Sequence, residues 1–276
     1  AHASFYMLGA YFAYALQDNL GFWGALVASP ILVGLVGVIA ERFFLRRVHH
    51  HGHAHELLLT FGLAFIIAEL VKLFFGNFPV NYRIPPELDF AAFTIGRANY
   101  PAYRMLMGAV AIGMFLLLYL LLTRTRIGIV VRSAIYKPRM AEALGHNVPL
   151  VFMGVFGVGA ALAGLAGAVA GAFYTTNPNM AIELGVLVFV VVVVGGLGSL
   201  EGAMLASLLI GVVTSLAVAI DATLADLFAL VGARHWAESA GGIFTLKVSS
   251  LAATLPFALM LLVLLVRPRG LLGEKA

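Results

Sequence analysis

The stretch TRTRIGIVVRSAIYKPRMAEALGHNV, residues 123–148, is strongly basic and lies between two long apolar segments. It has one acid, Glu142, against five basic residues, which are Arg124, Arg126, Arg132, Lys137 and Arg139. In membrane proteins, short loops on the cytoplasmic side collect an excess of Lys and Arg. The stretch is therefore predicted to lie on the cytoplasmic face of a membrane, and this prediction orients the rest of the chain.

A short helix is predicted within this stretch. Pro138 suits a first helical turn, because its fixed φ and missing N–H are harmless there. Residues 139–144 then make about two turns, and Gly145 supplies a left-handed stop. The small residues Ala141, Ala143 and Gly145 leave little side-chain bulk, so part of this helix can dock into a groove on another protein. The alternative interpretation is an ordinary basic loop that only sets the topology.

The composition places the chain in lipid. Of its 276 residues, 62% are hydrophobic and only 11% are charged, whereas about a quarter of an ordinary soluble domain is charged. There is no cysteine, which excludes disulfides, thiol catalysis and thiolate metal sites. The basic residues are divided among short loops, so membrane topology explains them and nucleic-acid binding is not indicated. The predicted fold class is all-α, a polytopic transmembrane helix bundle with a short cytoplasmic coupling helix and at least one broken helix.

Apolar runs of about 20 residues mark membrane crossings. Crossings are predicted at 20–45, 56–75, 101–123, 150–172, 201–220 and 248–266, while 4–16 is too short by itself and ends at residues 17–19. Residues 76–100 and 221–247 are predicted to be external. In this arrangement eleven basic residues are cytoplasmic and five are external, which agrees with the usual excess on the inner side. The external ones are Arg83, Arg97, Arg104, Arg234 and Lys247.

Two stretches are candidates for a translocation pathway. The first, Tyr174, Asn177 and Pro178, follows a Gly-rich helix that small residues allow to pack closely in the centre of the bundle; its alternative is a capped external turn. The second follows a short apolar helix at 183–194 and consists of Gly195, Gly196, Gly198 and Ser199. Unwound backbone within a membrane is tolerated where protein shields it or where it lines a cavity. This second stretch is therefore predicted to break a helix.

The charged residues inside the apolar runs are few. Glu69 and Lys72 are three residues apart on one helical face, which fits either a self-paired ion pair or an ion or substrate site. Glu69, Glu183 and Glu201 are the candidates for membrane-embedded carboxylates. The histidine-rich run at 49–55 suits a solvated loop or, alternatively, a metal site. No catalytic group, cofactor site or Walker phosphate loop is predicted.

Several blocks of the sequence resemble one known family. PRMAEALGHNV at 138–148 and the Gly- and Ala-rich run after it are similar to the coupling loop and following helix of permease subunits of branched-chain amino-acid ABC importers, the LivH-like family. Further similar blocks occur in the same order, namely AHASFYMLGAY at 1–11, LLTFGLAF at 58–65, TRIGIVVRS at 125–133, GGLGSLEGAMLASLLIG at 195–211 and RPRGLLG at 267–273. The resemblance covers nearly the whole chain. Members of the family carry a further apolar segment upstream, so we expect one transmembrane element before residue 1.

The resemblance implies a function and a set of partners. It implies that residues 1–276 form a single transmembrane permease domain in a bacterial inner membrane with a cytoplasmic C-terminus. The partners would be a second homologous permease, two ABC ATPase subunits and a periplasmic substrate-binding protein. The chain would not be an enzyme, since ATP would be hydrolysed on the ATPase subunits. The helix that seats in the ATPase would comprise Lys137, Pro138, Arg139, Met140, Ala141, Glu142, Ala143, Leu144, Gly145, His146 and Asn147.

Other functions stay open on the residues alone. The substrate implied by the resemblance is a branched-chain or other apolar amino acid, but relatives of the architecture also carry urea or small carboxylates. An ion-coupled secondary transporter or channel for a small solute is the alternative function, and it needs membrane-embedded carboxylates along a path. A membrane-bound enzyme has little support, because no acid, base, nucleophile and metal ligand converge in the sequence.

Overall fold

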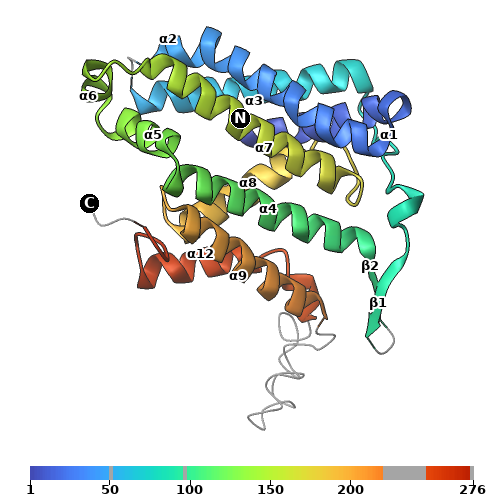
Figure 1. Ribbon diagram of the computed structural model, residues 1–276. Helices are drawn as coiled ribbons and strands as arrows, with labels where there is room; N and C mark the ends of the chain where they lie inside the picture. The colour runs from blue at the N-terminus through green and yellow to red at the C-terminus, as the bar shows by residue number, and fades with distance from the viewer. Residues whose placement is uncertain (50–51, 96–97, 220–246, 274–276) are drawn as a thin grey trace. The chain divides into compact units, whose positions relative to one another are not determined.

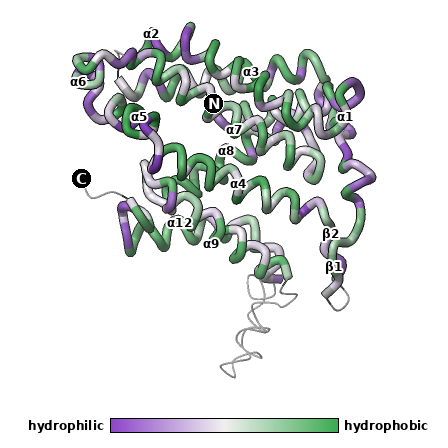
Figure 2. The backbone as a smooth tube through the Cα atoms, viewed as in Figure 1, coloured by the Kyte–Doolittle hydropathy of each residue, from purple (hydrophilic) through white to green (hydrophobic). Residues whose placement is uncertain are grey.

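The structure is a computed structural model that describes residues 1–49, 52–95, 98–219 and 247–273. About four fifths of the described chain, 79%, is helical, which confirms the predicted all-α class. Five helical segments are long and apolar enough to cross a membrane: His2–Val48, Ala54–Phe75, Ala102–Arg124, Val148–Gly171 and Leu200–Ala219. In Figure 2, hydrophobic residues run along the helices, and hydrophilic residues gather at helix ends and connections.

Two compact units make up the chain, Ala1–Gly185 and Val186–Ala276. The first contains, in order, α1 (His2–Ala40), the π-helical turn η1 (Glu41–Leu45), α2 (Arg46–Val48), α3 (His53–Phe75), the short η3 (Pro86–Leu88), β1 (Ala91–Ile95), β2 (Ala98–Pro101), α4 (Ala102–Arg124), α5 (Arg126–Tyr136), α6 (Pro138–Ala143) and α7 (Val148–Gly171). The second contains α9 (Leu200–Ala219), η5 (Val248–Leu251) and α12 (Leu255–Val266). Helix α8 (Met180–Gly195) starts in the first unit and ends in the second. The predicted external segment 221–247 lies outside the described residues except for Lys247.

Helix α1 is a hairpin of two arms. Gly21 has left-handed backbone angles, φ 67° and ψ 174°, between the arms, and glycine tolerates this region because it has no Cβ. The Ser29 hydroxyl donates a hydrogen bond of 2.6 Å to the Gly9 carbonyl oxygen, which a straight helix would hold far away. The first arm continues through the polar residues 17–19, where it was predicted to end. That prediction was wrong because polar side chains at the end of a span remain compatible with a helix.

Helix α7 packs along α1 (Figure 1), as expected for a helix with regularly spaced small residues. Small residues make the contact: a Cβ built on Gly9 would overlap the Gly164 backbone, and one built on Gly167 would overlap the Tyr6 carbonyl oxygen. Such contacts let helix backbones approach closely in lipid. The hydrophobic core of the unit includes Phe5 and Val33, and it gathers around this seam.

The segment between α3 and α4 is tied to the end of α7. The Tyr82 hydroxyl donates to the Ala168 carbonyl oxygen at 3.0 Å, and the Val80 N–H donates to the Thr176 carbonyl oxygen at 3.0 Å. Burial raises the pKa of Tyr82 above its usual range, so the hydroxyl keeps the proton that it donates. Strands β1 and β2 form an antiparallel hairpin here, in which Phe93 stacks on Tyr100. This hairpin was not predicted from the sequence.

Candidate functional site

The basic stretch folds as two short helices at an angle set by local capping. The Thr125 hydroxyl oxygen accepts a hydrogen bond from the Gly128 N–H at 3.3 Å, which begins α5. Helix α5 ends at Lys137, whose non-helical φ of −141° turns the chain. Pro138 then occupies the first turn of α6, as predicted. The two helices are therefore separated by a single residue.

Backbone hydrogen bonds close the end of α6. Gly145 has φ 85°, which confirms the predicted left-handed stop. The His146 N–H donates to the Ala141 carbonyl oxygen at 3.0 Å, and the Gly145 N–H donates to the Glu142 carbonyl oxygen at 2.9 Å. This pair of bonds is a Schellman motif, which satisfies the last carbonyls of a helix. The shape of α6 is thus fixed by its own residues.

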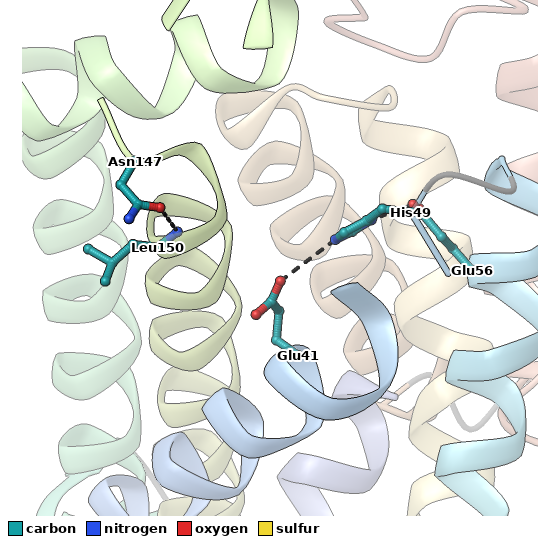
Figure 3. A network of polar contacts seen from close by, with 5 residues as sticks. All are labelled: Glu41, His49, Glu56, Asn147 and Leu150. Carbon is teal, nitrogen blue, oxygen red and sulfur yellow. Dashed lines mark hydrogen bonds and ion pairs between the residues drawn. The ribbon is translucent and has the colours of Figure 1, made fainter. Parts of the chain in front are cut away.

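Helix α7 begins directly after this turn. The Asn147 side-chain oxygen accepts a hydrogen bond from the Leu150 N–H at 3.2 Å (Figure 3), which caps the helix. Pro149 lies in the first turn of α7, where proline is well tolerated. The connection from α6 to α7 is thus stabilised at the end of α6 by the Schellman motif and at the start of α7 by the Asn147 cap.

Helix α6 touches the rest of the bundle through one side chain. Ala141 is 1% exposed and packs with Ala134 of α5 and Val148 of α7. Every other residue of 137–147 is exposed. Met140 and Leu144, at 63% and 77% exposure, form an apolar surface among charged neighbours. Ala141 was expected on the docking surface but faces inward, so the outward surface consists of Met140 and Leu144 beside the small residues Ala143 and Gly145.

The first pathway candidate is a capped turn between α7 and α8. The Asn177 side-chain oxygen accepts a hydrogen bond from the Asn179 N–H at 2.8 Å. Thr176 is buried, and its hydroxyl donates to the Gly171 carbonyl oxygen at 3.0 Å. Pro178 is also buried, whereas Tyr174 is 60% exposed. Tyr174 is therefore the member of this set most open to other molecules.

The second pathway candidate is the turn between α8 and α9, in the second unit. Gly196 and Gly198 are left-handed, with φ of 103° and 86°, and the Ser199 hydroxyl oxygen accepts a hydrogen bond from the Gly202 N–H at 3.0 Å. The tail after α12 lies on this turn, because the Leu271 and Leu272 N–H groups donate to the carbonyl oxygens of Val194 and Gly195. The two pathway candidates belong to different units.

The charged residues of the helices were only partly anticipated. Lys72 and Glu69 form the predicted ion pair, with 2.7 Å between Nζ and Oε1. Glu183 and Glu201 are exposed on their helices. The buried carboxylate is instead Glu41, at 2% exposure; it was not predicted from the sequence because it adjoins Arg42 at the end of an apolar run. No group of three metal-ligating side chains occurs within the described residues, which leave out His50 and His51.

The apolar helices and the protruding α6 define a multi-pass membrane protein of the permease class. The family described as "Branched-chain amino acid transport system / permease component" matches residues 1–264, and the chain belongs to this family. The high-affinity branched-chain amino acid transport system permease protein LivH of Escherichia coli K12 is 28% identical over 290 residues, which cover 99% of this chain and 85% of LivH.

Two further relatives agree with this assignment. BraD of Pseudomonas aeruginosa, a permease protein of the same kind of transport system, is 26% identical and covers 99% of this chain and 85% of its own length. A probable branched-chain amino acid transport permease protein LivH of Methanocaldococcus jannaschii is 25% identical over 78% of this chain and 70% of its own length. No solved structure matches this chain.

Proposed function

We propose that this chain is the transmembrane permease subunit of an ATP-driven importer for branched-chain or other apolar amino acids, and that it forms half of the translocation pathway. The family and its named relatives support this function. The sequence has no Walker phosphate loop, so ATP hydrolysis is assigned to two separate ATPase subunits. A second homologous permease supplies the other half of the pathway, and a periplasmic binding protein delivers the substrate. The two compact units act together as one permease domain.

The protruding α6 carries this proposal. It is fixed in shape by local caps, held through one buried alanine and exposed elsewhere, with Met140 and Leu144 pointing away from the bundle. An apolar pair on a rigid helix is suited to a groove on a partner protein. The partner proposed for it is the ATPase subunit. A movement of the ATPase would then pass through α6 into α7 and switch the bundle between inward- and outward-facing states.

The proposed location is the bacterial inner membrane, with α6 and the C-terminus in the cytoplasm. The exposed basic residues of α5 and α6 support this orientation, because they favour the cytoplasmic side and its anionic lipids. Tyr174 and the turn at 195–199 are proposed to border the pathway. The exposure of Tyr174 and the two left-handed glycines in the turn support this assignment.

The docking role is tested by two substitutions on α6. Gly145→Trp and Glu142→Arg both alter the exposed surface, and neither position contacts the core. Membranes containing the complete importer are solubilised, the ATPase that co-purifies with the permease is quantified, and substrate uptake is measured. We expect both variants to insert normally and to lose roughly tenfold or more in ATPase recovery and uptake, which corresponds to disrupting a buried contact at an interface.

Gly76→Trp is the matched control for Gly145→Trp. Gly76 has the same φ of 85° and, like Gly145, has no atom within 4 Å of the place where a Cβ would stand, but it follows the C-terminal end of α3. This variant should retain ATPase recovery, because it also places a tryptophan at a positive φ but leaves α6 untouched. Unchanged ATPase recovery and uptake in both α6 variants would show that the contact is elsewhere.

A further inference from the structure

A buried carboxylate lies directly after α1, where few charges are expected. Glu41 is 2% exposed, and neither of its side-chain oxygens has a hydrogen-bond partner within the described residues. It belongs to the π-helical turn η1, a local distortion that is frequent at functional sites. Its closest polar neighbour is His49, whose Nε2 is 3.7 Å from Glu41 Oε1. Because an isolated buried carboxylate is costly, this arrangement requires a compensating group.

His49 lies between two carboxylates. Its Nδ1 is 2.5 Å from Oε1 of Glu56 at the start of α3, and its Nε2 faces Glu41 (Figure 3). Each of these two gaps needs one proton, since nitrogen and oxygen lone pairs otherwise face each other. Two ionised carboxylates and a neutral imidazole hold only one proton, on the ring. The arrangement is therefore complete only when one additional proton is bound.

Burial and the neighbouring charges act on that proton in opposite directions. Among the described residues, the charged groups placed against this cluster are Glu41 from η1, Glu56 from α3 and the Arg46 guanidinium from α2, which attracts the Glu41 carboxylate. Helix α7 contributes an uncharged ring, Phe152, whose centroid is 5.5 Å from that of His49. Burial of Glu41 disfavours its charged form, which favours a proton in the gap between Glu41 and His49.

Glu41, His49 and Glu56 lie next to the residues against which α6 packs. Phe152 contacts His49 on one side and packs against the cluster of Ala134, Ala141 and Val148 on the other. Helices α2 and α6 accordingly lie at the same end of this unit in Figure 1. A change in the His49 position would reach the start of α7, from which α6 projects.

We propose that Glu41, His49 and Glu56 form a proton-binding site, in which one bound proton joins η1 to α3 and thereby positions the end of α7 that carries α6. His49 is a positioning residue in this site. The effect on transport rests on the proposed permease function. The proton-dependent contact between η1 and α3 is a property of this chain alone. When the proton is lost at alkaline pH, η1 and α3 separate at the end of the unit where α6 lies.

Two substitutions distinguish the effect of the bound proton from the effect of the side chains. In Glu41→Gln the amide N–H donates to His49 Nε2, so the gap is filled without a titratable proton. In His49→Phe the ring against Phe152 is kept, but both nitrogens are lost. His55→Gln is the matched control, because His55 is an exposed histidine of the same region.

The test uses the complete importer in liposomes, with the pH on the α6 side varied from about 6 to about 9, a range that starts near the unperturbed pKa of histidine. Uptake by the wild type and by His55→Gln should fall about threefold or more towards alkaline pH. Glu41→Gln should keep its uptake across the range, and His49→Phe should be low throughout. An alkaline fall in Glu41→Gln equal to that of the wild type, or a wild-type profile in His49→Phe, overturns the proposal.

Hydrogen–deuterium exchange of the peptide covering residues 41–49 gives a second readout that does not depend on transport. After correction for intrinsic exchange, its protection should decrease at alkaline pH in the wild type and stay constant in Glu41→Gln. If protection depends on pH equally in the wild type and in Glu41→Gln, the proposal is overturned. This comparison holds even if His49→Phe fails to assemble. Failure of the ATPase to co-purify with the wild type would instead count against the proposed permease function.

Discussion

The Ser29 hydroxyl bonds to the carbonyl oxygen of Gly9, twenty residues earlier, and so fastens the two arms of the α1 hairpin together. Ser29→Ala should lower the free energy of unfolding by about 1 kcal/mol, since a buried hydrogen bond between helices contributes roughly this much. The measurement is unfolding in mixed detergent micelles, followed by tryptophan fluorescence. Ser207→Ala, at an exposed serine that bonds within its own helix, should change little. Equal losses in the two variants would contradict the role given to Ser29.

The contact between α1 and α7 depends on the absence of side chains at specific positions. Gly167→Ala should destabilise the protein by about 1–3 kcal/mol, because the added methyl group overlaps the Tyr6 backbone and forces the helices apart. Gly113→Ala, on α4, has open space around its Cβ position and should be neutral or slightly stabilising, since alanine favours the helix. The same unfolding measurement tests both. A stable Gly167→Ala protein would show that this contact is looser than described.

The tail after α12 is held to the α8–α9 turn by glycines. Gly270 has φ 81°, and a Cβ there would meet the Gly196 backbone. Gly270→Ala should therefore release the tail and increase its cleavage in limited proteolysis. Gly52 also has a positive φ, 94°, but no atom lies near its Cβ position. Gly52→Ala serves as the control, and equal tail cleavage in both variants would rule out the steric explanation.

The orientation can be measured with single cysteines, because the chain has none. Asn77→Cys and Met140→Cys place a thiol at exposed positions after α3 and on α6. A membrane-impermeant maleimide applied to spheroplasts should label Asn77→Cys at once and Met140→Cys only after permeabilisation. The reverse pattern would place α6 outside the cell and remove the basis for its proposed contact with an ATPase.

Much of this architecture was predictable because it depends on local chemistry. Pro138 and Gly145 bound α6 as predicted, since a proline in a first turn and a left-handed glycine at a helix end act through the backbone alone. The pairing of Glu69 with Lys72 followed from their spacing on one helix. The close packing of α7 followed from its regularly spaced small residues.

What was missed depends on contacts between distant residues. The inward direction of Ala141 follows from packing against α5 and α7, which the sequence of α6 does not contain. Glu41 and Glu56 are fifteen positions apart in sequence and meet only through His49. The burial of Glu41 likewise depends on neighbouring elements, so its position beside Arg42 gave a misleading indication of an exposed charge.

The glycine seam between α1 and α7 also restricts how this unit can move. Sliding one helix past the other by a single residue, about 1.5 Å, would bring side chains to places where only hydrogen atoms fit. No gradual path of small shifts exists along such a contact, so the hairpin and α7 behave as one rigid slab. We therefore expect the structural changes of a transport cycle to use hinges outside this slab, and a displacement at one end of α7 to be passed along its packed length to the other end.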